Sequence, residues 1–364
     1  MFNKNFSGKR LNLLKEAMQK SGFDCFVCIQ NPNIQYLTAN SKISNGGFVI
    51  FVPLNSQPTL LASRLEGERA KKEVKNVEVE VLGENEKFED KISSKILEVK
   101  AEKVCFDSLT LPQLKTLRKK LSKVQFECKP EILLNLRKIK DFEEVKMLRK
   151  ACRIADKAMK TAIEFLRAGV REYEVAAEAE YTMRRMGAEE VAFKTIVASG
   201  FRSSFPHAGN TNKKVRSGEA VVIDLGAKFL GYNSNLTRTV FVGKPANLQK
   251  KVYKTVLEAQ TKALKNIRVG MVGWEADLLA RKIVMEKGYG EYFIHGLGHG
   301  IGLEVHEPPT LSTKSKEKLE KMNVFTVEPG IYLPKKFGVR IEDTVLLTED
   351  GLKPLTRYEK EFYQ

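Results

Sequence analysis

The sequence predicts an α/β domain followed by an α+β domain. A chain of 364 residues is long for a single hydrophobic core, so two domains are the default expectation. Amphipathic helical stretches alternate with short apolar runs in the first part, whereas strands return between longer helices in the second. We therefore predict an α/β domain over residues 1–130 and an α+β domain with a largely antiparallel sheet over residues 136–364.

The first domain reads as an alternation of helices and strands. Residues 10–22 are amphipathic and end in a glycine, and residues 23–29 form an apolar, strand-like run. Further helices are predicted over residues 87–100 and 111–121, and further strands over residues 46–53, 77–82, 103–107 and 124–128. This domain contains no histidine.

The second domain begins with one long amphipathic helix, which we predict from Asp141 to Ala168. Asp141 is a suitable N-cap and Gly169 a suitable stop. The later helices and strands follow the same periodicity rules. Helices are predicted over residues 171–187, 248–267 and 274–287, and strands over residues 191–198, 219–226, 235–242, 323–328 and 338–347.

Composition and charge exclude several classes of protein. With 42% hydrophobic and 29% charged residues, the chain is ordinary globular material. The net charge of +17 comes from scattered basic residues, which favours a solvated lysine-rich surface over a specific nucleic-acid interface. No signal peptide and no run of 18 apolar residues is visible, so we expect a cytoplasmic protein without a membrane span.

The five cysteines indicate a reducing compartment. They are odd in number and all lie in the first half of the chain, at positions 25, 28, 105, 128 and 152. Cys25 and Cys28 form a lone CxxC, whereas a zinc ribbon needs a second pair. We predict core thiols.

Histidines and acids of the second domain form the candidate site. All four histidines of the chain lie in two loops rich in glycine or proline, SSFPHAGN and FIHGLGHGIGLEVHEPP. Asp224, Glu328 and Glu342 each follow an apolar, strand-like run, where an unpaired carboxylate is costly. These acids either form buried ion pairs with Arg238, Arg340 or lysines, or bind a divalent cation together with an imidazole.

Strand periodicity indicates how the site is assembled. If the chain turns at Phe229-Leu230, positions 224 and 235 face each other across a hairpin. Asn235, Thr237 and Thr239 would share one strand face, and Arg340, Glu342 and Thr344 would share another.

Four segments together resemble one enzyme family. IDLGAKFLGYNSNLTRT, HGLGHGIGLEVHE, TVEPGIY and RIEDTV are similar to the signature segments of the pita-bread metallopeptidases, in matching order along residues 136–360. That family includes methionine aminopeptidase, aminopeptidase P and prolidase, with the metal-free creatinase as a relative. The N-terminal α/β unit resembles the extra domain of prolidase, aminopeptidase P and creatinase, so prolidase is the preferred comparison.

The resemblance implies a set of site residues. Two divalent ions (Mn, Co, Zn or Fe) would be held at five ligand positions, and a metal-bound hydroxide would attack the peptide carbonyl while Glu328 carries the proton. The ligand positions are Asp224, Asn235, His299, Glu328 and Glu342. The positions that bind substrate or steady the tetrahedral intermediate are His207, His295 and His306, and the supporting positions are Thr237, Tyr332 and Arg340.

Asn235 departs from the family, which has a bridging aspartate there. An amide offers one good donor oxygen, so Asn235 cannot bridge two ions as a carboxylate does, and no aspartate lies between residues 225 and 276 to replace it. We therefore expect a weak second metal site. Three explanations stay open: a natural member with one tight metal, an inactive relative kept for binding, or a deliberate Asp→Asn change.

The expected function is that of a metal-dependent Xaa-Pro dipeptidase, impaired by Asn235. The alternatives are an aminopeptidase P-type exopeptidase, a non-catalytic pita-bread binding module, and a creatinase-like hydrolase working without metal. The expected partners are a short Xaa-Pro peptide and a second copy of the chain, with no membrane and no specific nucleic acid.

Overall fold

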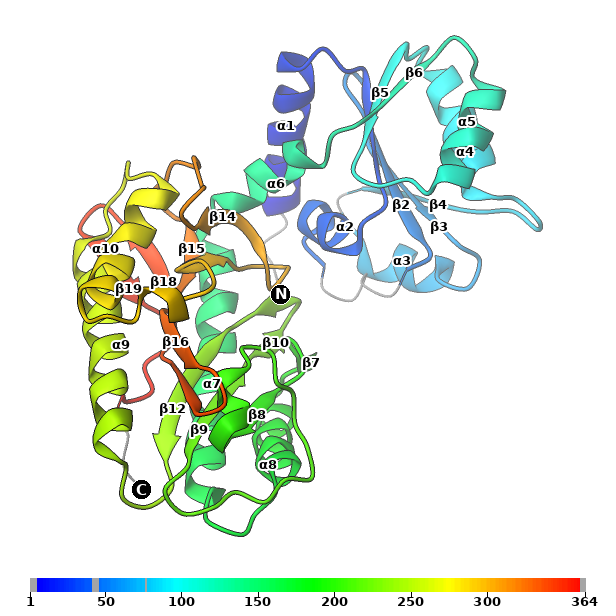
Figure 1. The fold of residues 1–364 in the computed structure, drawn as a ribbon. Helices are drawn as coiled ribbons and strands as arrows, with labels where there is room; N and C mark the ends of the chain where they lie inside the picture. Colours follow the sequence, from blue (N-terminus) through cyan, green and yellow to red (C-terminus); the bar gives the residue numbers. More distant parts are fainter. Residues whose placement is uncertain (1–4, 41–45, 76, 361–364) are drawn as a thin grey trace. The chain divides into compact units, whose positions relative to one another are not determined.

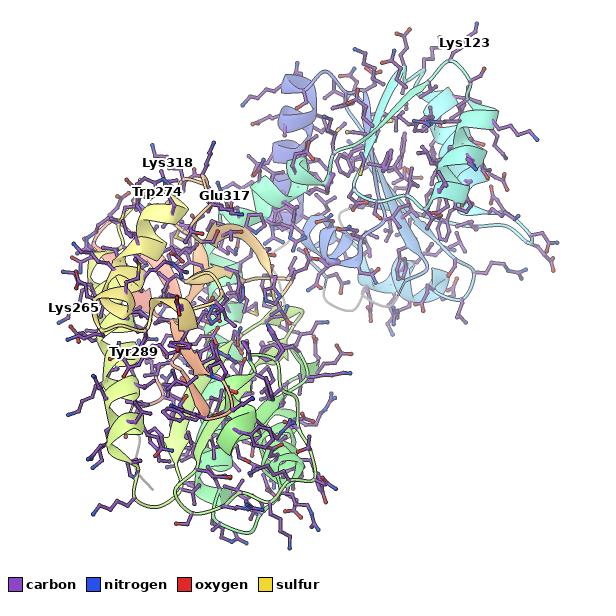
Figure 2. The ribbon with its side chains drawn as sticks, viewed as in Figure 1. Lys123, Lys265, Trp274, Tyr289, Glu317 and Lys318 are labelled. Atoms are coloured by element: carbon purple, nitrogen blue, oxygen red, sulfur yellow. The ribbon has the colours of Figure 1, made fainter. Side chains whose placement is uncertain are left out.

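A computed structural model describes residues 5–40, 46–75 and 77–360 (Figure 1). The chain divides into two compact units, Met1–Arg137 and Lys138–Gln364. Among the described residues, no helix combines the length and the apolar character needed to cross a membrane. Basic side chains are spread over both units, as Lys123 on the first and Lys265 and Lys318 on the second illustrate (Figure 2).

The first unit is a six-stranded mixed sheet with helices on both faces (Figure 1). The strand order is β4-β3-β2-β1-β5-β6, with parallel pairs at β3–β4, β1–β5 and β5–β6. The strands are β1 (Cys25–Cys28), β2 (Phe48–Pro53), β3 (Thr59–Ala62), β4 (Glu78–Val81), β5 (Lys103–Phe106) and β6 (Gln125–Cys128). The helices are α1 (Asn5–Lys20), α2 (Asn31–Thr38), α3 (Gly67–Glu73), α4 (Phe88–Glu98), α5 (Leu111–Lys120) and α6 (Pro130–Lys138), the last of which spans the division between the units.

Alternation along the strands explains this layered arrangement. In β1, Cys25 and Val27 face the core that α4 and α5 cover, while Phe26 and Cys28 are buried on the other side. Sequence periodicity did not predict α2, β3, α3 or α6. The cysteines of the described residues are free thiols and four are buried, but the prediction of core thiols is wrong for Cys128, which is exposed on β6.

The second unit consists of antiparallel sheets covered by two pairs of helices, as predicted. Helices α7 (Phe142–Phe165) and α8 (Glu172–Arg185) pack on one sheet core, and α9 (Asn247–Asn266) and α10 (Gly273–Glu286) on another. The strands of the first half are β7 (Glu190–Val191), β8 (Ile196–Ser199), β9 (Ala220–Leu225), β10 (Ala227–Phe229), β11 (Tyr232–Asn233) and β12 (Leu236–Phe241). Those of the second half are β13 (Gly298–Gly300), β14 (Glu307–Leu311), β15 (Val324–Val327), β16 (Gly330–Leu333), β17 (Phe337–Arg340), β18 (Asp343–Thr348) and β19 (Gly351–Pro354), and the short 3-10 helices are η1 (Gly200–Ser204) and η2 (Gly290–Tyr292).

Helix α7 begins as the sequence predicts. The Asp141 side chain accepts a hydrogen bond from the Glu144 backbone N–H at 2.9 Å, and the Glu144 carboxylate accepts one from the Asp141 N–H at 3.0 Å. In this capping box both carboxylates accept, and the backbone N–H groups of Asp141 and Glu144, which the first turn leaves unpaired, are the two donors. The helix ends at Phe165, three residues before the predicted Ala168, because Leu166 is already in an extended conformation.

The predicted pairing of Asp224 with Asn235 is wrong by two residues. Asp224 lies opposite Thr237, because the chain turns at Leu230-Gly231 rather than at Phe229-Leu230. Both turn residues have positive φ, 46° and 81°, as the tight hairpin turn requires. Asn235 therefore lies diagonally from Asp224 on the same face of the hairpin.

The predicted strand over residues 338–347 is interrupted. It forms β17 and β18, which belong to different sheets, and Glu342 lies at the break between them. An isolated bridge joins Glu342 to Thr237 of β12, where the Glu342 N–H donates to the Thr237 carbonyl at 3.1 Å. This bridge brings an acid of the second half of the unit next to the acids of the first half.

Candidate metal centre

A cavity of about 510 Å³ in the second unit collects most of the predicted site residues. Asp224 lines it from β9, Asn235 from the residue before β12, His299 from β13 and Glu328 from the residue after β15. Glu342 lies beneath them and is fully buried. The two halves of the unit thus contribute to one site.

Three side chains form a compact cluster within it. One ligand atom each of His299, Glu328 and Glu342 lies within 4.8 Å of the others. His299 Nδ1 lies 3.1 Å from the Gly300 carbonyl, to which it donates, and Nε2 lies 3.2 Å from Glu328 Oε1. The carbonyl therefore fixes the tautomer that leaves Nε2 available to bind a cation.

The ionisation of this cluster is strongly perturbed. Burial alone would raise the pKa of Glu328, but the hydrogen bond and charge of His299 outweigh it and lower that pKa to about 2. The pKa of His299 is raised, because Glu328 overcomes the opposing effect of burial. Burial, followed by repulsion from Glu328 and Asp224, raises the pKa of Glu342 well above its usual range. Several carboxylates sharing one buried site have this effect on one another.

Unsatisfied oxygens show that the site suits a cation. Asp224 Oδ1, Asn235 Oδ1 and Glu342 Oε1 are buried and have no hydrogen-bond partner among the described residues. Buried polar atoms are nearly always paired, so each exception requires an explanation. A divalent ion bound by oxygens and one imidazole would satisfy them, and this donor set suits Mn, Fe, Co or Zn. The residues present fit a divalent cation.

Asp224 is held by an arginine rather than by the three-residue cluster. Its Oδ2 accepts a hydrogen bond from Arg340 Nη2 at 2.6 Å. Arg340 Nη1 also donates to the Tyr332 hydroxyl at 2.7 Å, and that hydroxyl lies 2.9 Å from His295 Nε2. The ion pair between Asp224 and Arg340 is one of those that the sequence left open, whereas Arg238 pairs with Asp343 at 2.8 Å.

The remaining predicted residues fall into two groups. Thr237 and Tyr332 are buried and support other site residues; Thr237 Oγ1 donates to Glu342 Oε2 at 2.6 Å. His207 and His306 are exposed on the cavity wall, without a hydrogen bond to the described residues. The His306 ring lies against that of His299, with centroids 4.1 Å apart and planes inclined by 44°.

Sequence reasoning missed the walls of the cavity. Phe193, Ile196 and Val305 give it apolar surface, and Lys194 adds a cation. No motif marks these residues, because their only shared property is their position around the cavity. Residues 191–198 were predicted simply as one strand, whereas the chain between β7 and β8 carries Phe193 and Lys194 to the cavity.

Comparison with known proteins identifies the family. The model described as Metallopeptidase family M24 matches residues 146–349, and that of the Creatinase/Prolidase N-terminal domain matches residues 10–139. The chain belongs to metallopeptidase family M24. The prediction of a pita-bread metallopeptidase with an additional N-terminal domain is therefore confirmed, and the family implies a divalent metal.

Relatives cover almost the whole chain. The Xaa-Pro dipeptidase of Pyrococcus horikoshii is 42% identical over 354 residues, which are 97% of this chain and 98% of the relative. The solved Xaa-Pro dipeptidase from Bacillus anthracis has a TM-score of 0.93 at 35% identity, covering 98% of this chain and 99% of that one. The solved X-Pro aminopeptidase from Thermotoga maritima has a TM-score of 0.87 at 35% identity, covering 96% of this chain and 100% of that one. This member of the M24 family is thus similar to both dipeptidases and aminopeptidases.

Proposed function

We propose that this M24 metallopeptidase is a Xaa-Pro dipeptidase that works with one tightly bound divalent ion. The observation that carries the proposal is the cavity of about 510 Å³ with apolar walls, in which His299, Glu328 and the buried Glu342 form a compact cluster. Unsatisfied oxygens of Asp224, Asn235 and Glu342 lie at the same site. This volume is within the range of about 300–1,000 Å³ typical of small-molecule sites. Relatives that are Xaa-Pro dipeptidases support the same reading.

The residues of the chain divide the hydrolytic work among them. A divalent ion held by His299, Glu328 and Glu342 would polarise the scissile carbonyl and lower the pKa of a water molecule. Glu328 is anchored through Oε1, which accepts a hydrogen bond from Thr326 Oγ1 at 2.8 Å. Its other oxygen is the group we assign to take the proton from water and to deliver it to the proline nitrogen as the C–N bond breaks.

The exposed imidazoles are placed to bind the substrate. We assign His207 and His306 to the substrate carbonyl and to the negative charge that develops on its oxygen. Both line the cavity with ring nitrogens that have no partner in the described part of the chain. Both ring nitrogens of His295, by contrast, lie within hydrogen-bond distance of protein oxygens, Gly296 O at 2.7 Å and the Tyr332 hydroxyl at 2.9 Å. We assign His295 to the support of Tyr332 and Arg340.

The cavity walls suit a dipeptide with proline at its second position. Phe193, Ile196 and Val305 offer apolar surface to a pyrrolidine ring, which has no N–H to satisfy once its nitrogen is acylated. Lys194 lines the same cavity, and its ammonium group has no hydrogen bond or ion pair with the described residues. We assign Lys194 to the free carboxylate of a dipeptide, which a longer peptide does not carry at that position.

Asn235 limits the metal content. Asn235 lines the cavity, and its buried Oδ1 has no hydrogen-bond partner among the described residues and can serve as one neutral ligand. A second ion would have Asp224 and Glu342, but Asp224 also pairs with Arg340. We therefore propose one tight ion and a second, weak one.

Hydrolysis of a short peptide series tests the function. Ala-Pro, Ala-Pro amide, Ala-Pro-Gly and Ala-Ala are assayed with Mn²⁺ or Co²⁺ and with EDTA, using this chain and Asn235→Asp. The proposal requires metal-dependent cleavage with Ala-Pro as the best substrate. Cleavage that persists in EDTA would favour metal-free histidine chemistry. If neither protein cleaves any peptide or binds metal, a non-catalytic binding module is the better interpretation.

We also propose a cytoplasmic homodimer. The free thiols of Cys25, Cys28, Cys105 and Cys152 are buried within the fold and are typical of a reducing compartment. The dimer rests on the likeness to prolidase, and light scattering coupled to size-exclusion chromatography measures it directly. A monomer at micromolar concentration would contradict this part of the proposal.

A further inference from the structure

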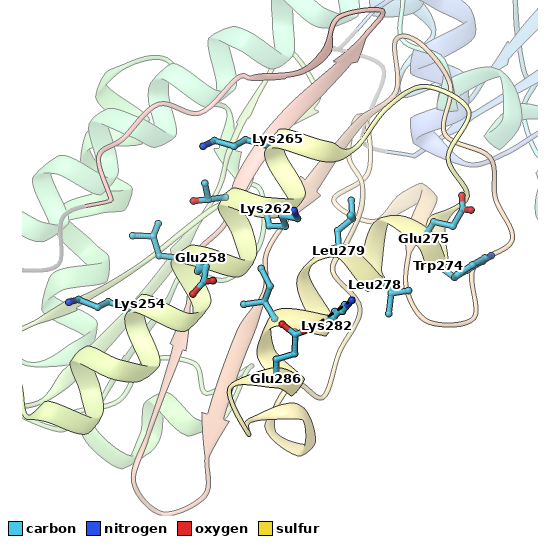
Figure 3. Close-up of a pocket in the computed structure, with 13 residues that line it drawn as sticks. Lys254, Glu258, Lys262, Lys265, Trp274, Glu275, Leu278, Leu279, Lys282 and Glu286 are labelled. Carbon is cyan, nitrogen blue, oxygen red and sulfur yellow. Dashed lines mark ion pairs between the residues drawn. The ribbon is translucent and has the colours of Figure 1, made fainter.

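A groove lies between helices α9 and α10 (Figure 3). Its volume is about 940 Å³, and all of its lining residues come from these two helices. Leu257, Leu279 and Ile283 form an apolar floor, since they are partly buried and pack on the core of the unit. None of the lining residues is shared with the cavity of the metal centre.

The wall from α10 exposes large apolar side chains. Trp274 is 44% exposed and Leu278 is 46% exposed, and Met285 continues the same side of the helix at 58%. Spacings of four and seven residues place all three on one helical face. Trp274 is the single tryptophan of the chain, and an exposed tryptophan among other apolar residues is typical of a protein-binding surface.

The wall from α9 is basic. Lys254, Lys262 and Lys265 line the groove, and none has an ion pair with the described residues. The single acid of α9, Glu258, lies 3.4 Å from Lys287 and is neutralised by it. On α10, Glu286 lies 3.9 Å from Lys282, drawn as a dashed line in Figure 3. The remaining acid of the lining, Glu275, lies on α10 and accepts a hydrogen bond from the Val272 N–H at 2.8 Å. The groove therefore combines an apolar floor with three unneutralised ammonium groups along its α9 edge.

We propose that this groove binds an acidic amphipathic helix of another protein. Residues 254–265 and 274–286 each span about 17–18 Å at 1.5 Å per residue, which is the length of a three-turn helix of about 12 residues. A helix of that length would lay an apolar ridge with i, i+4, i+7 spacing on the floor and direct its acidic side chains toward α9.

Charge and shape distinguish this partner from two others. A second copy of the chain carries the same net charge of +17 and would bring like charges together at the contact. An anionic membrane would attract the lysines, but interfacial helices bury a protruding apolar face in lipid, whereas here the apolar floor is recessed between two helices. An acidic helix matches both the recessed apolar floor of the groove and the positive charge of Lys254, Lys262 and Lys265.

Fluorescence of Trp274 tests the proposal directly, because no other tryptophan contributes. The probe is a synthetic 12-residue helix with a leucine ridge and glutamate flanks, and the matched control peptide has the same ridge with lysine flanks. We expect saturable binding of the acidic peptide with a blue-shifted emission, at least about tenfold tighter than the basic peptide at low salt, and weaker at high salt. Neutralising the edge with Lys254→Gln, Lys262→Gln and Lys265→Gln should remove this preference.

Variants of the apolar wall complete the test. Leu278→Ser should weaken peptide binding at least about tenfold, whereas Leu65→Ser, at an exposed leucine of the first unit, should leave it unchanged. Both variants should retain the metal content of the unmodified chain. Equal binding of the two peptides, or a response that survives Leu278→Ser, would overturn the proposal. So would self-association that Leu278→Ser abolishes, or a blue shift with phosphatidylserine vesicles but not with the acidic peptide.

Discussion

Replacing Asn235 by aspartate should create a second tight metal site. Asn235 is 6% exposed and lines the cavity, and its Oδ1 is buried without a hydrogen-bond partner among the described residues. A carboxylate of nearly the same size can place one oxygen on each of two ions, which an amide cannot do. We expect bound metal to rise from about one to two ions per chain in Asn235→Asp, and peptide hydrolysis to rise with it.

The magnitude follows from the linkage of binding to folding. One site at a free metal concentration of 100 times its Kd raises the free energy of unfolding by about 2.7 kcal/mol. In a unit of this size, 1 kcal/mol shifts Tm by about 2–4 °C, so a second site should add about 5–10 °C to the stabilisation by metal. In EDTA the effect of Asn235→Asp on stability reverses and the substitution lowers Tm. Without a cation, the new carboxylate is repelled by the three acids already at the site, Asp224, Glu328 and Glu342. The metal-free Asn235→Asp protein should therefore melt below the unmodified chain.

Isothermal titration with Mn²⁺ and thermal melts with and without metal provide the two readouts. Asn247→Asp is the matched control, since it makes the same charge change at an exposed residue of α9. It should alter neither stoichiometry nor the metal-dependent part of Tm. The reasoning is refuted if Asn235→Asp binds no more metal than the unmodified chain, or if its metal-induced gain in Tm is no larger.

Four further substitutions test individual assignments. His299→Ala removes the single imidazole of the cluster and should abolish tight metal binding in calorimetry, whereas His306→Ala should keep the ion and lose activity; the opposite pattern would exchange their roles. Glu328→Gln should melt as a folded protein but lose about 10²–10⁴-fold in kcat, and a loss below tenfold would contradict its role in proton transfer. Lys194→Met should lower kcat/KM for Ala-Pro about tenfold and leave Ala-Pro amide unaffected; an equal loss on both would show that Lys194 does not bind the carboxylate.

The sequence predicted the elements better than their junctions. The capping box at Asp141 and Glu144 marks the start of α7 through local hydrogen bonds, which sequence spacing reveals. The hairpin register was wrong because Leu230 adopts a positive φ that leucine rarely takes, so the turn was placed one residue too early. Gly226 is the residue in the sequence that reflects the true register. A Cβ at this position would lie 2.0 Å from the Ser234 carbonyl oxygen, and only glycine permits so close an approach of the two strands.

In the candidate site, too, features set by neighbouring residues were predicted, whereas contacts between residues far apart in the sequence were not. Its acids and histidines were found because each lies in a short segment whose local pattern is distinctive, a glycine-rich or proline-rich loop or the end of an apolar run. The pairing of Asp224 with Arg340 joins residues 116 positions apart, and the isolated bridge joins Thr237 of β12 to Glu342, 105 positions further along the chain. Such contacts depend on how the two halves of the unit pack, which periodicity within either half does not determine. The apolar and cationic walls of the cavity escaped prediction for the same reason.

Anomalous diffraction from crystals grown with Mn²⁺ tests the central claim most directly, because it locates each ion independently of activity. We predict one strong peak within bonding distance of His299 Nε2, Glu328 and Glu342, and at most a weak second peak beside Asp224. Two peaks of equal strength bridged by the Asn235 side chain, or no peak at the His299–Glu328–Glu342 cluster, would contradict it.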